Sequence, residues 1–266
     1  MRSAFLIGVI LLLGCSAGVY NYVQPQGPRY AGVPSREAPR ATADTLRVVS
    51  FNIAWSEQID SALVALQSHA VLADADVILL QEMDAPGVQR LAGVLGMHYV
   101  FYPATLHPKT ARDFGNAVLS RWPIVADAKI VLPHMAWFRG TQRAATAATI
   151  RVGADSVRVY SAHLGTLAEI GFGARRDQLR AILADAALHP HVILGGDMNE
   201  PWLGGVARDT GYDWPTEDGP RTALIGRVDH IFLRGLSATG SGTVFDNHAA
   251  SDHRPVWVKA VWTLAN

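Results

Sequence analysis

The chain has 266 residues, 49% of them hydrophobic, and its 23 Lys and Arg residues balance its 23 Asp and Glu residues. A neutral chain lacks the generally basic surface of proteins that grip nucleic acid by its phosphates, although a local basic patch is compatible with these numbers. The single cysteine, Cys15, excludes an internal disulfide and a cysteine-based zinc site.

Residues 1–14 combine an early arginine with the apolar run Ala4–Leu13, which is typical of a secretory signal. The string Leu-Leu-Gly-Cys-Ser ending at Ser16 resembles the bacterial lipobox, in which cleavage leaves the cysteine, here Cys15, as a lipidated first residue. The alternative is an uncleaved signal anchor, since Ala4–Tyr20 is nearly long enough to span a membrane, but Gly and Ser interrupt that run. Both interpretations predict an exported, membrane-tethered protein in the bacterial periplasm or at the cell surface.

The next segment, residues 15–44, is rich in proline and has no apolar periodicity, so we predict a flexible linker. From residue 45 onward, short β-rich runs outnumber helical patterns. We predict strands over or within 46–53, 76–83, 98–103, 116–125, 128–133, 144–152, 156–164, 191–200, 227–234, 238–245 and 254–262, and helices over 57–73, 87–95 and 174–188. This pattern favours one domain over 45–266, with two packed sheets and the helices outside them.

Polar side chains gather at or near the ends of these predicted strands. They are Asn52, Glu82, His163, Asp197, Asn199, Asp229, Asp252 and His253. An ionised carboxylate at the end of a buried strand loses hydration unless something compensates for it. Strand ends can converge on one rim, where gathered oxygen ligands suit a hard cation such as Mg²⁺ or Mn²⁺.

The same residues carry a family resemblance. The strings SFNI, LLQE, GNAVLSRWPI, SAHL, GGDMNEP, RVDHIF and SDHRPV occur in the order seen in the endonuclease/exonuclease/phosphatase superfamily, over residues 47–258. That superfamily includes DNase I-like nucleases, exonuclease III-like repair enzymes, sphingomyelinases and inositol polyphosphate phosphatases. The resemblance implies an α/β fold, a four-layer sandwich of two mixed β-sheets flanked by helices. It also implies a metal-dependent hydrolase that cleaves phosphodiester or phosphomonoester bonds by water attack.

The resemblance also implies a role for each residue around the metal. Glu82 matches the principal metal-binding glutamate, Asn52 lies beside it, and Asp252 matches an acid near the metal. Asp197 matches the acid that orients or deprotonates the attacking water, and Asn199 helps to hold that site. One or two Mg²⁺ or Mn²⁺ ions would serve as cofactor. Taken alone, Asp197 and Asn199 could instead cap a following helix, which is the less favoured alternative.

Further roles concern the phosphate. His253 matches the essential histidine at the phosphate, Asp229 its carboxylate partner, and His163 a second histidine near the scissile phosphate. Asn116 resembles an amide that contacts the phosphate in the phosphatase branches. Taken alone, His163 could instead be a satisfied core histidine, and Asp229 and His253 could be a structural pair.

Loop residues give weaker signals. Arg112 and Arg143, and less so Arg139, are candidate substrate-binding residues, since a guanidinium group binds phosphate in a bidentate manner, but loop arginines are usually just solvated. Trp137 and Phe138 fit a substrate-contacting or lipid-contacting loop, or ordinary packing.

Three functional classes follow from these observations. The first is a tethered phosphoesterase, whose substrate could be a small phosphodiester, a phospholipid headgroup or extracellular DNA or RNA. The second is a catalytically silent binding module of the same fold, which the intact set of acids and histidines disfavours. The third is a structural envelope lipoprotein, which buried carboxylates disfavour. We expect a phosphate-ester substrate, a membrane contact through the N-terminal anchor, no tight nucleic-acid binding, and a monomer.

Overall fold

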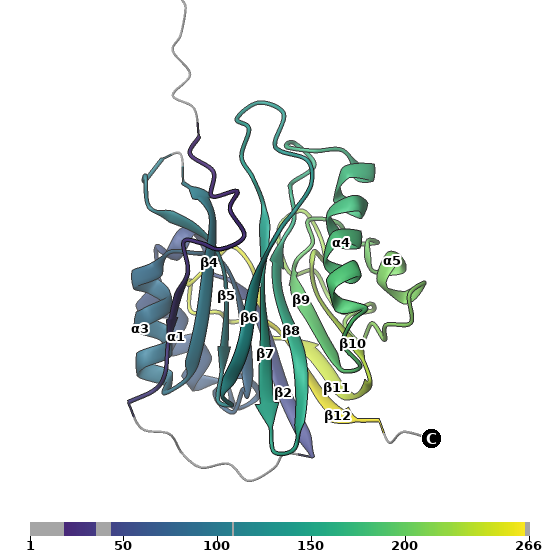
Figure 1. Ribbon diagram of the computed structural model, residues 1–266. Helices are drawn as coiled ribbons and strands as arrows, with labels where there is room; N and C mark the ends of the chain where they lie inside the picture. The colour runs from purple at the N-terminus through teal and green to yellow at the C-terminus, as the bar shows by residue number, and fades with distance from the viewer. Residues whose placement is uncertain (1–18, 36–43, 108, 264–266) are drawn as a thin grey trace, which may run out of the picture.

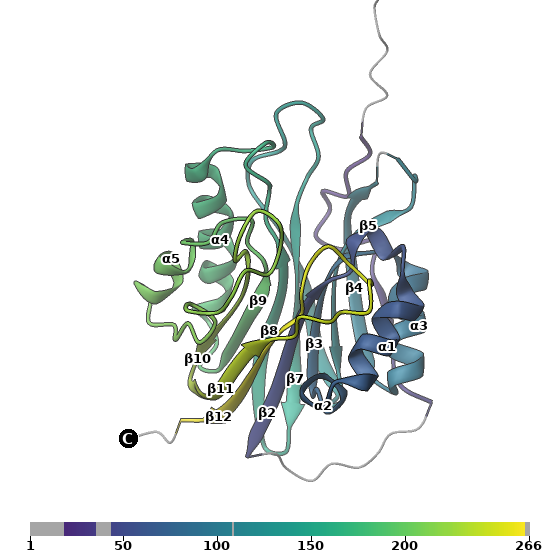
Figure 2. The ribbon, with the colours of Figure 1, turned by 180° about the vertical axis from the view of Figure 1, so that it is seen from behind.

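Two mixed β-sheets lie face to face in this computed structural model, which describes residues 19–35, 44–107 and 109–263. The helices cover the outer faces of both sheets (Figures 1 and 2). The seven-stranded sheet has the order β1-β4-β5-β3-β2-β12-β11, and the five-stranded sheet has the order β10-β9-β8-β7-β6. The predicted four-layer α/β sandwich is confirmed.

The larger sheet consists of β1 (Tyr30–Gly32), β2 (Thr45–Asn52), β3 (Val77–Met83), β4 (His98–Leu106), β5 (Asp113–Ser120), β11 (Leu236–Thr243) and β12 (Val256–Trp262). The smaller sheet consists of β6 (Ile124–Val131), β7 (Ala144–Val152), β8 (Asp155–His163), β9 (Val192–Asp197) and β10 (Asp229–Arg234). The helices are η1 (Ala54–Ser56), α1 (Ile59–Ser68), α2 (Ala70–Ala73), α3 (Ala85–Leu95), α4 (Phe172–Ala186) and α5 (Gly204–Arg208). None of the helices within the described ranges is long and apolar enough to cross a membrane.

The core explains why the central strands read as almost continuous apolar runs. Along β2, Val48 packs between the two sheets, whereas Val49 packs among the helices that cover the outer face. Along β3, Leu79 likewise packs between the two sheets, whereas Leu80 packs on the outer face with the helices. Because successive side chains of a strand point to opposite faces, a strand covered on both sides needs apolar residues at every position.

The segment before residue 45 differs from the predicted linker. Residues 30–32 form β1, which pairs antiparallel with β4 at the edge of the larger sheet. Arg29 forms an ion pair with Asp127 at 2.6 Å, and the backbone at Asn21 forms an isolated antiparallel β-bridge with Thr105. Part of this proline-rich segment is therefore packed against the domain. The predicted signal peptide and lipobox, including Cys15, lie outside the described residues.

Two helical details also differ from the sequence prediction. The helix predicted over 57–73 is divided, because His69 has an extended backbone (φ −94°, ψ 119°) between α1 and α2. The short helix α5 was not predicted, since its sequence, Gly-Gly-Val-Ala-Arg, contains two poor helix formers.

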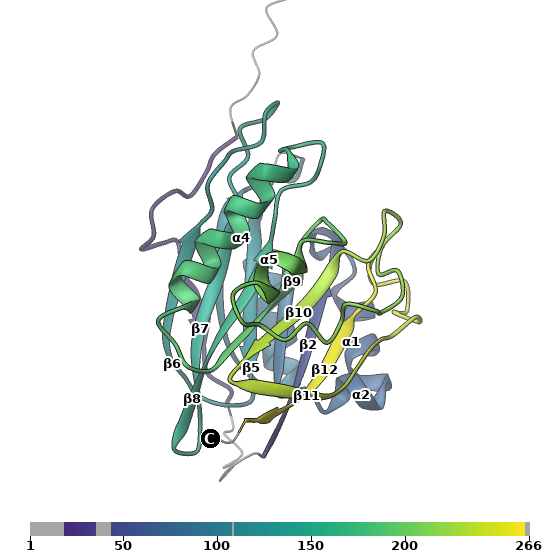
Figure 3. The same ribbon diagram turned by 90° about the vertical axis from the view of Figure 1, so that its right-hand side faces the viewer.

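Strand direction determines where the polar ends meet. Strand β2 runs parallel to β3, and β8 runs parallel to β9, so that His163 lies opposite Asp197. Strand β10 is antiparallel to β9 and begins with Asp229, also opposite Asp197. The ends of β8 and β9 and the start of β10 lie at the same end of the sandwich (Figure 3), and this brings the polar residues there together.

We expect Gly196→Ala to destabilise the protein strongly. Gly196 has φ +144°, and a Cβ atom there would lie 1.8 Å from the carbonyl oxygen of Ala162 on β8. The free energy of unfolding should fall by about 3 kcal/mol or more, as measured by urea denaturation. Gly93→Ala in α3 is the control, because nothing lies within 4 Å of its added Cβ. That change should stabilise the protein by about 0.5–1 kcal/mol. Equal stability of the two variants would contradict this account.

Candidate active site

An open cleft of about 880 Å³, counting the space at its mouth, lies at the end of the sandwich where the polar strand ends meet. Its lining includes seven of the residues predicted from the sequence: Glu82, Arg139, Arg143, His163, Asp197, Asn199 and His253. Asn52 and Asp229 lie directly behind this lining, in contact with Asp197 and His253 respectively. Residues from β2, β3, β8, β9, β10 and the β11–β12 loop therefore share one site.

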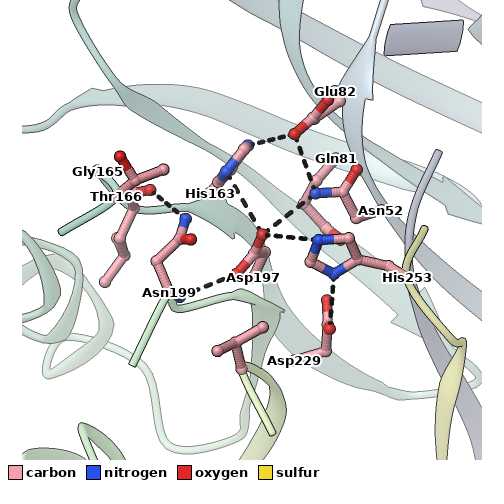
Figure 4. Close-up of polar contacts among 12 residues, drawn as sticks. Asn52, Gln81, Glu82, His163, Gly165, Thr166, Asp197, Asn199, Asp229 and His253 are labelled. Atoms are coloured by element: carbon pink, nitrogen blue, oxygen red, sulfur yellow. Dashed lines mark hydrogen bonds and ion pairs between the residues drawn. The ribbon is translucent and has the colours of Figure 1, made fainter. Parts of the chain in front are cut away.

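Asp197 lies at the centre of the polar contacts (Figure 4). One carboxylate oxygen, Oδ1, accepts a hydrogen bond from the backbone N–H of Asn199 at 2.9 Å. The other, Oδ2, accepts one from the side-chain amide of Asn52 at 3.2 Å. Burial, together with the nearby charges of Asp229 and Glu82, raises the pKa of Asp197 to about 7, although the charge of His253 opposes this shift. A carboxylate in this state can accept a proton near neutral pH.

Glu82 enters the cleft from an irregular point in β3. The pairing of β3 with β5 shifts register between Leu80 and Met83, and Glu82 has a left-handed φ of 59°. Its Oε1 accepts a hydrogen bond from the amide of Asn52 at 3.2 Å. Burial raises the pKa of Glu82, whereas the hydrogen bond from Asn52 and the charge of Arg143 lower it by less. A strained backbone of this kind persists where the surrounding structure holds a side chain in a required place.

His253 is held in its cationic form by a buried carboxylate. Its Nδ1 lies 2.8 Å from Oδ2 of Asp229, whose side chain is fully buried. Burial alone would lower the pKa of His253, but the charges of Asp229, Asp197 and Asp252 overcome this effect and raise the pKa to about 10. The opposite nitrogen, Nε2, lies 3.7 Å from Oδ2 of Asp197. His253 thus presents a positively charged N–H donor to the centre of the site.

His163 is held in the opposite, neutral state. Burial, followed by the charges of Arg143 and His253, lowers its pKa well below the usual range. Arg143 lies 3.1 Å from Nδ1 of His163 and can only donate, so Nδ1 is the acceptor nitrogen and Nε2 carries the proton. That Nε2 lies 3.5 Å from Oδ2 of Asp197. One cationic and one neutral histidine therefore lie beside the same carboxylate, that of Asp197.

The donor set fits a hard divalent cation. Asp197 is buried and Glu82 is half-buried, and burial is the main cause that raises the pKa of each carboxyl. A cation beside them would favour their charged forms. Asp252 is exposed nearby, and its charge contributes to the raised pKa of Glu82. Asn52, predicted among the metal residues, turns its side-chain oxygen to the backbone N–H of Ala54 instead. In this orientation Asn52 positions the two carboxylates by donating to both.

Two of the predicted substrate-binding residues do not reach the cleft. The amide of Asn116 donates to the carbonyl oxygen of Ala144 at 2.6 Å and so joins β5 to β7 of the other sheet. Arg112 forms an ion pair with Asp84 at 2.8 Å and donates to the carbonyl oxygen of Trp55. Both therefore connect parts of the fold. Arg143 and Arg139, in contrast, do line the cleft.

Several cleft residues were not predicted from the sequence. Oε2 of Glu169 forms an ion pair with Nη2 of Arg143 at 2.7 Å and so fixes the guanidinium group beside His163. Elsewhere in the lining, the centre of the Trp55 ring lies 4.7 Å from that of His107, with the two rings tilted by 41°, and Nζ of Lys109 lies 4.4 Å from the centre of the Trp55 ring. The closeness of Trp55 to Asn52 in the sequence could have indicated it. Glu169 lies in a loop with no local signal.

Comparison with known proteins supports the resemblance seen in the sequence. The sequence profile of the Endonuclease/Exonuclease/phosphatase family matches residues 49–253. No curated protein matches the chain in sequence.

Solved structures share the fold at low identity. A structure titled endonuclease/exonuclease/phosphatase, from Beutenbergia cavernae, is 19% identical, with a TM-score of 0.67 over 83% of this chain and 72% of that one. The human Nocturnin catalytic domain with bound sulfate is 18% identical, with a TM-score of 0.65 over 90% and 98% of the two chains. A humanized D. rerio TDP2 is also 18% identical, with a TM-score of 0.63 over 82% and 99%.

We expect Asp229→Asn to lower the pKa of His253. In metal-free protein, His253 should stay protonated throughout the neutral range and titrate near pH 10. Removing the negative partner removes the largest influence that favours the cation, so the titration should move to lower pH. Histidine NMR resonances followed against pH would measure the shift. Identical titration of His253 in both proteins would contradict the assigned pair.

Proposed function

The chain belongs to the Endonuclease/Exonuclease/phosphatase family, and from this premise we propose that it is a metal-dependent phosphoesterase. Members of the family typically hydrolyse phosphoester bonds and generally use divalent metals. The observation that carries the proposal is the convergence of one cationic and one neutral histidine on the buried carboxylate of Asp197, inside an open cleft. A binding module would have no need for histidines held in opposite charge states around an acid.

Mg²⁺ or Mn²⁺ is the cation that we assign to the site. Glu82 and Asp252 would hold it, with Asp197 close by. When bound, such an ion neutralises phosphoryl oxygens and the charge that develops on the leaving group.

Asp197 is the residue that we assign to the attacking water. The amide of Asn52 and the backbone N–H of Asn199 fix its carboxylate from two sides. With its pKa near 7 in the metal-free site, it can take a proton from water as the water oxygen approaches phosphorus. Asn199 is itself anchored, because its side-chain amide donates to the carbonyl oxygen of Leu164 at 2.9 Å.

The histidines and Arg143 are assigned to the phosphoryl group. His253 offers a cationic N–H from Nε2, whereas the neutral His163 offers its Nε2–H from the other side of Asp197. Arg143 adds a fixed positive charge beside His163, although Glu169 compensates part of it. Donors that are already in place stabilise developing charge without reorganising during the reaction.

The purified protein should hydrolyse bis-p-nitrophenyl phosphate with Mg²⁺ or Mn²⁺, and EDTA should abolish this activity. His253→Ala and Asp197→Ala should each lower kcat roughly 100-fold or more, because each removes a group that acts on the reacting atoms. The matched controls are His134→Ala and Asp209→Ala, which replace exposed residues and should leave the rate unchanged. Full activity of a variant that lacks both His253 and Asp197 side chains would refute the mechanism.

We also propose that the protein is exported and held at a membrane by lipidated Cys15. The apolar run before Cys15 and the lipobox-like string support this proposal. Cys15→Ser should move the protein from the membrane fraction to the soluble fraction, as measured by fractionation and immunoblotting. Unchanged membrane association of this variant would favour an uncleaved signal anchor instead.

A further inference from the structure

The exposed tryptophan and phenylalanine side chains of the described residues lie in segments at the cleft end of the sandwich. Their exposed fractions range from 54% to 87%, and the described residues concerned are Trp137, Phe138, Phe172, Trp202 and Phe245. The first two lie in the β6–β7 loop, Phe172 is the first residue of α4, and Trp202 and Phe245 come shortly after the ends of β9 and β11. At the opposite end, the segment between α4 and β9 exposes Leu188, but no tryptophan or phenylalanine. We call these five residues the aromatic rim.

The most prominent part of the rim is connected to the cleft. The β6–β7 loop projects beyond the sheets (Figure 1). The backbone N–H of Trp137 donates to the carbonyl oxygen of Glu169 at 3.0 Å, and Glu169 in turn holds Arg143 in the cleft. The same loop supplies Arg139 to the cleft lining. A surface that contacts this loop would therefore lie at the opening of the cleft.

The N-terminal segment is attached to this same loop. The side-chain amide of Asn21 donates to the carbonyl oxygen of Gly140 at 2.7 Å, and its oxygen accepts from the backbone N–H of Gln142 at 2.9 Å. The preceding part of the chain, which contains the apolar run Ala4–Leu13 and Cys15, therefore joins the domain at the cleft end. An anchor placed there would hold the aromatic rim and the cleft toward the bilayer rather than away from it.

We propose that the aromatic rim docks on a lipid bilayer, and that the phosphoesterase site acts on phosphoester bonds of lipid headgroups in that bilayer. This inference rests on the proposed phosphoesterase function and on the proposed anchor. Tryptophan and phenylalanine are suited to the boundary between headgroups and acyl chains, where a protein can bury rings without crossing the membrane. Lys109 and Arg139 at the cleft mouth complement an anionic headgroup.

The chemical step is a hydrolysis that needs no additional reactant. The oxygen of water forms a bond to phosphorus, and the bond between phosphorus and one esterified alcohol oxygen breaks. One water proton passes to Asp197, and the leaving alcohol oxygen takes the Nε2 proton of the cationic His253. The proton held by Asp197 then restores the cationic His253, so that both residues return to their starting states. The products are either diacylglycerol with a phosphorylated headgroup or phosphatidate with a free headgroup alcohol.

The test compares lipid and soluble substrates for the same full-length chain. The chain is reconstituted in vesicles of phosphatidylethanolamine and phosphatidylglycerol, and the water-soluble and lipid products are both assayed. Bis-p-nitrophenyl phosphate is assayed in the same vesicles. The variant Trp137→Ser/Phe138→Ser removes two rim residues that do not line the cleft, and Leu188→Ser is the matched control at the opposite end.

We expect the double variant to lose roughly 10-fold or more of its lipid hydrolysis, because two large rings no longer bury themselves in the interface. Its hydrolysis of the soluble ester should not change, and Leu188→Ser should match the parent in both assays. Unchanged lipid hydrolysis by the double variant would overturn the docking surface. An equal loss on both substrates would also overturn it, since the defect would then lie in the site or the fold.

Two further results keep the inference separate from the proposed function. A parent chain that hydrolyses the soluble ester but not the vesicle lipids would overturn the lipid assignment and leave the phosphoesterase proposal intact. A parent chain that hydrolyses neither would refute the phosphoesterase proposal itself.

Tryptophan fluorescence provides an independent measure of docking. Brominated lipids should quench a component of the fluorescence of the parent chain that is missing in Trp137→Phe. Equal quenching of both proteins would contradict docking through this loop.

Discussion

The site depends on the cost of burying several carboxylates together. Asp197 and Asp229 lie opposite each other on β9 and β10, and both are almost completely buried. Without compensation, two such charges would each become neutral, because burial and mutual repulsion both favour the protonated form. His253 compensates one side of the pair by lying between them as a cation. The remaining excess of acid, around Glu82 and Asp197, is what a divalent cation would balance.

This balance explains why the fold places polar residues where apolar strands end. The parallel pairs β2–β3 and β8–β9 deliver Asn52 and His163 to the same end of the sandwich. The N–H donors around Asp197 come from different strands and loops, so each is fixed by the sheets rather than by its own flexibility. The positive φ of Glu82 and of Asn199 is a local cost that the packed sheets offset. Stability of the sandwich and geometry of the cleft are therefore aspects of the same packing.

The sequence predicts the layers and most of the site, because strand ends and short motifs are local features. Residues such as Glu82 and Asp197 stand at the ends of apolar strands, where their burial needs an explanation. Asn116 is not among the residues that line the cleft, and its contact with Ala144 on the other sheet depends on how the sheets pack. Glu169 was missed for the same reason, since only the folded loop brings it to Arg143. Strand β1 was missed because three edge residues in a proline-rich segment carry no periodic signal.

The central claim is that the buried acids form a binding site for a divalent cation, and thermal unfolding with Mn²⁺ tests it most directly. An ion that binds the folded state alone raises the melting temperature in proportion to the logarithm of its concentration once the site is saturated. The account predicts such a rise for the parent chain and its loss in Glu82→Gln, which keeps the shape of the side chain but removes its charge. No rise in the parent, or an equal rise in Glu82→Gln, would contradict it.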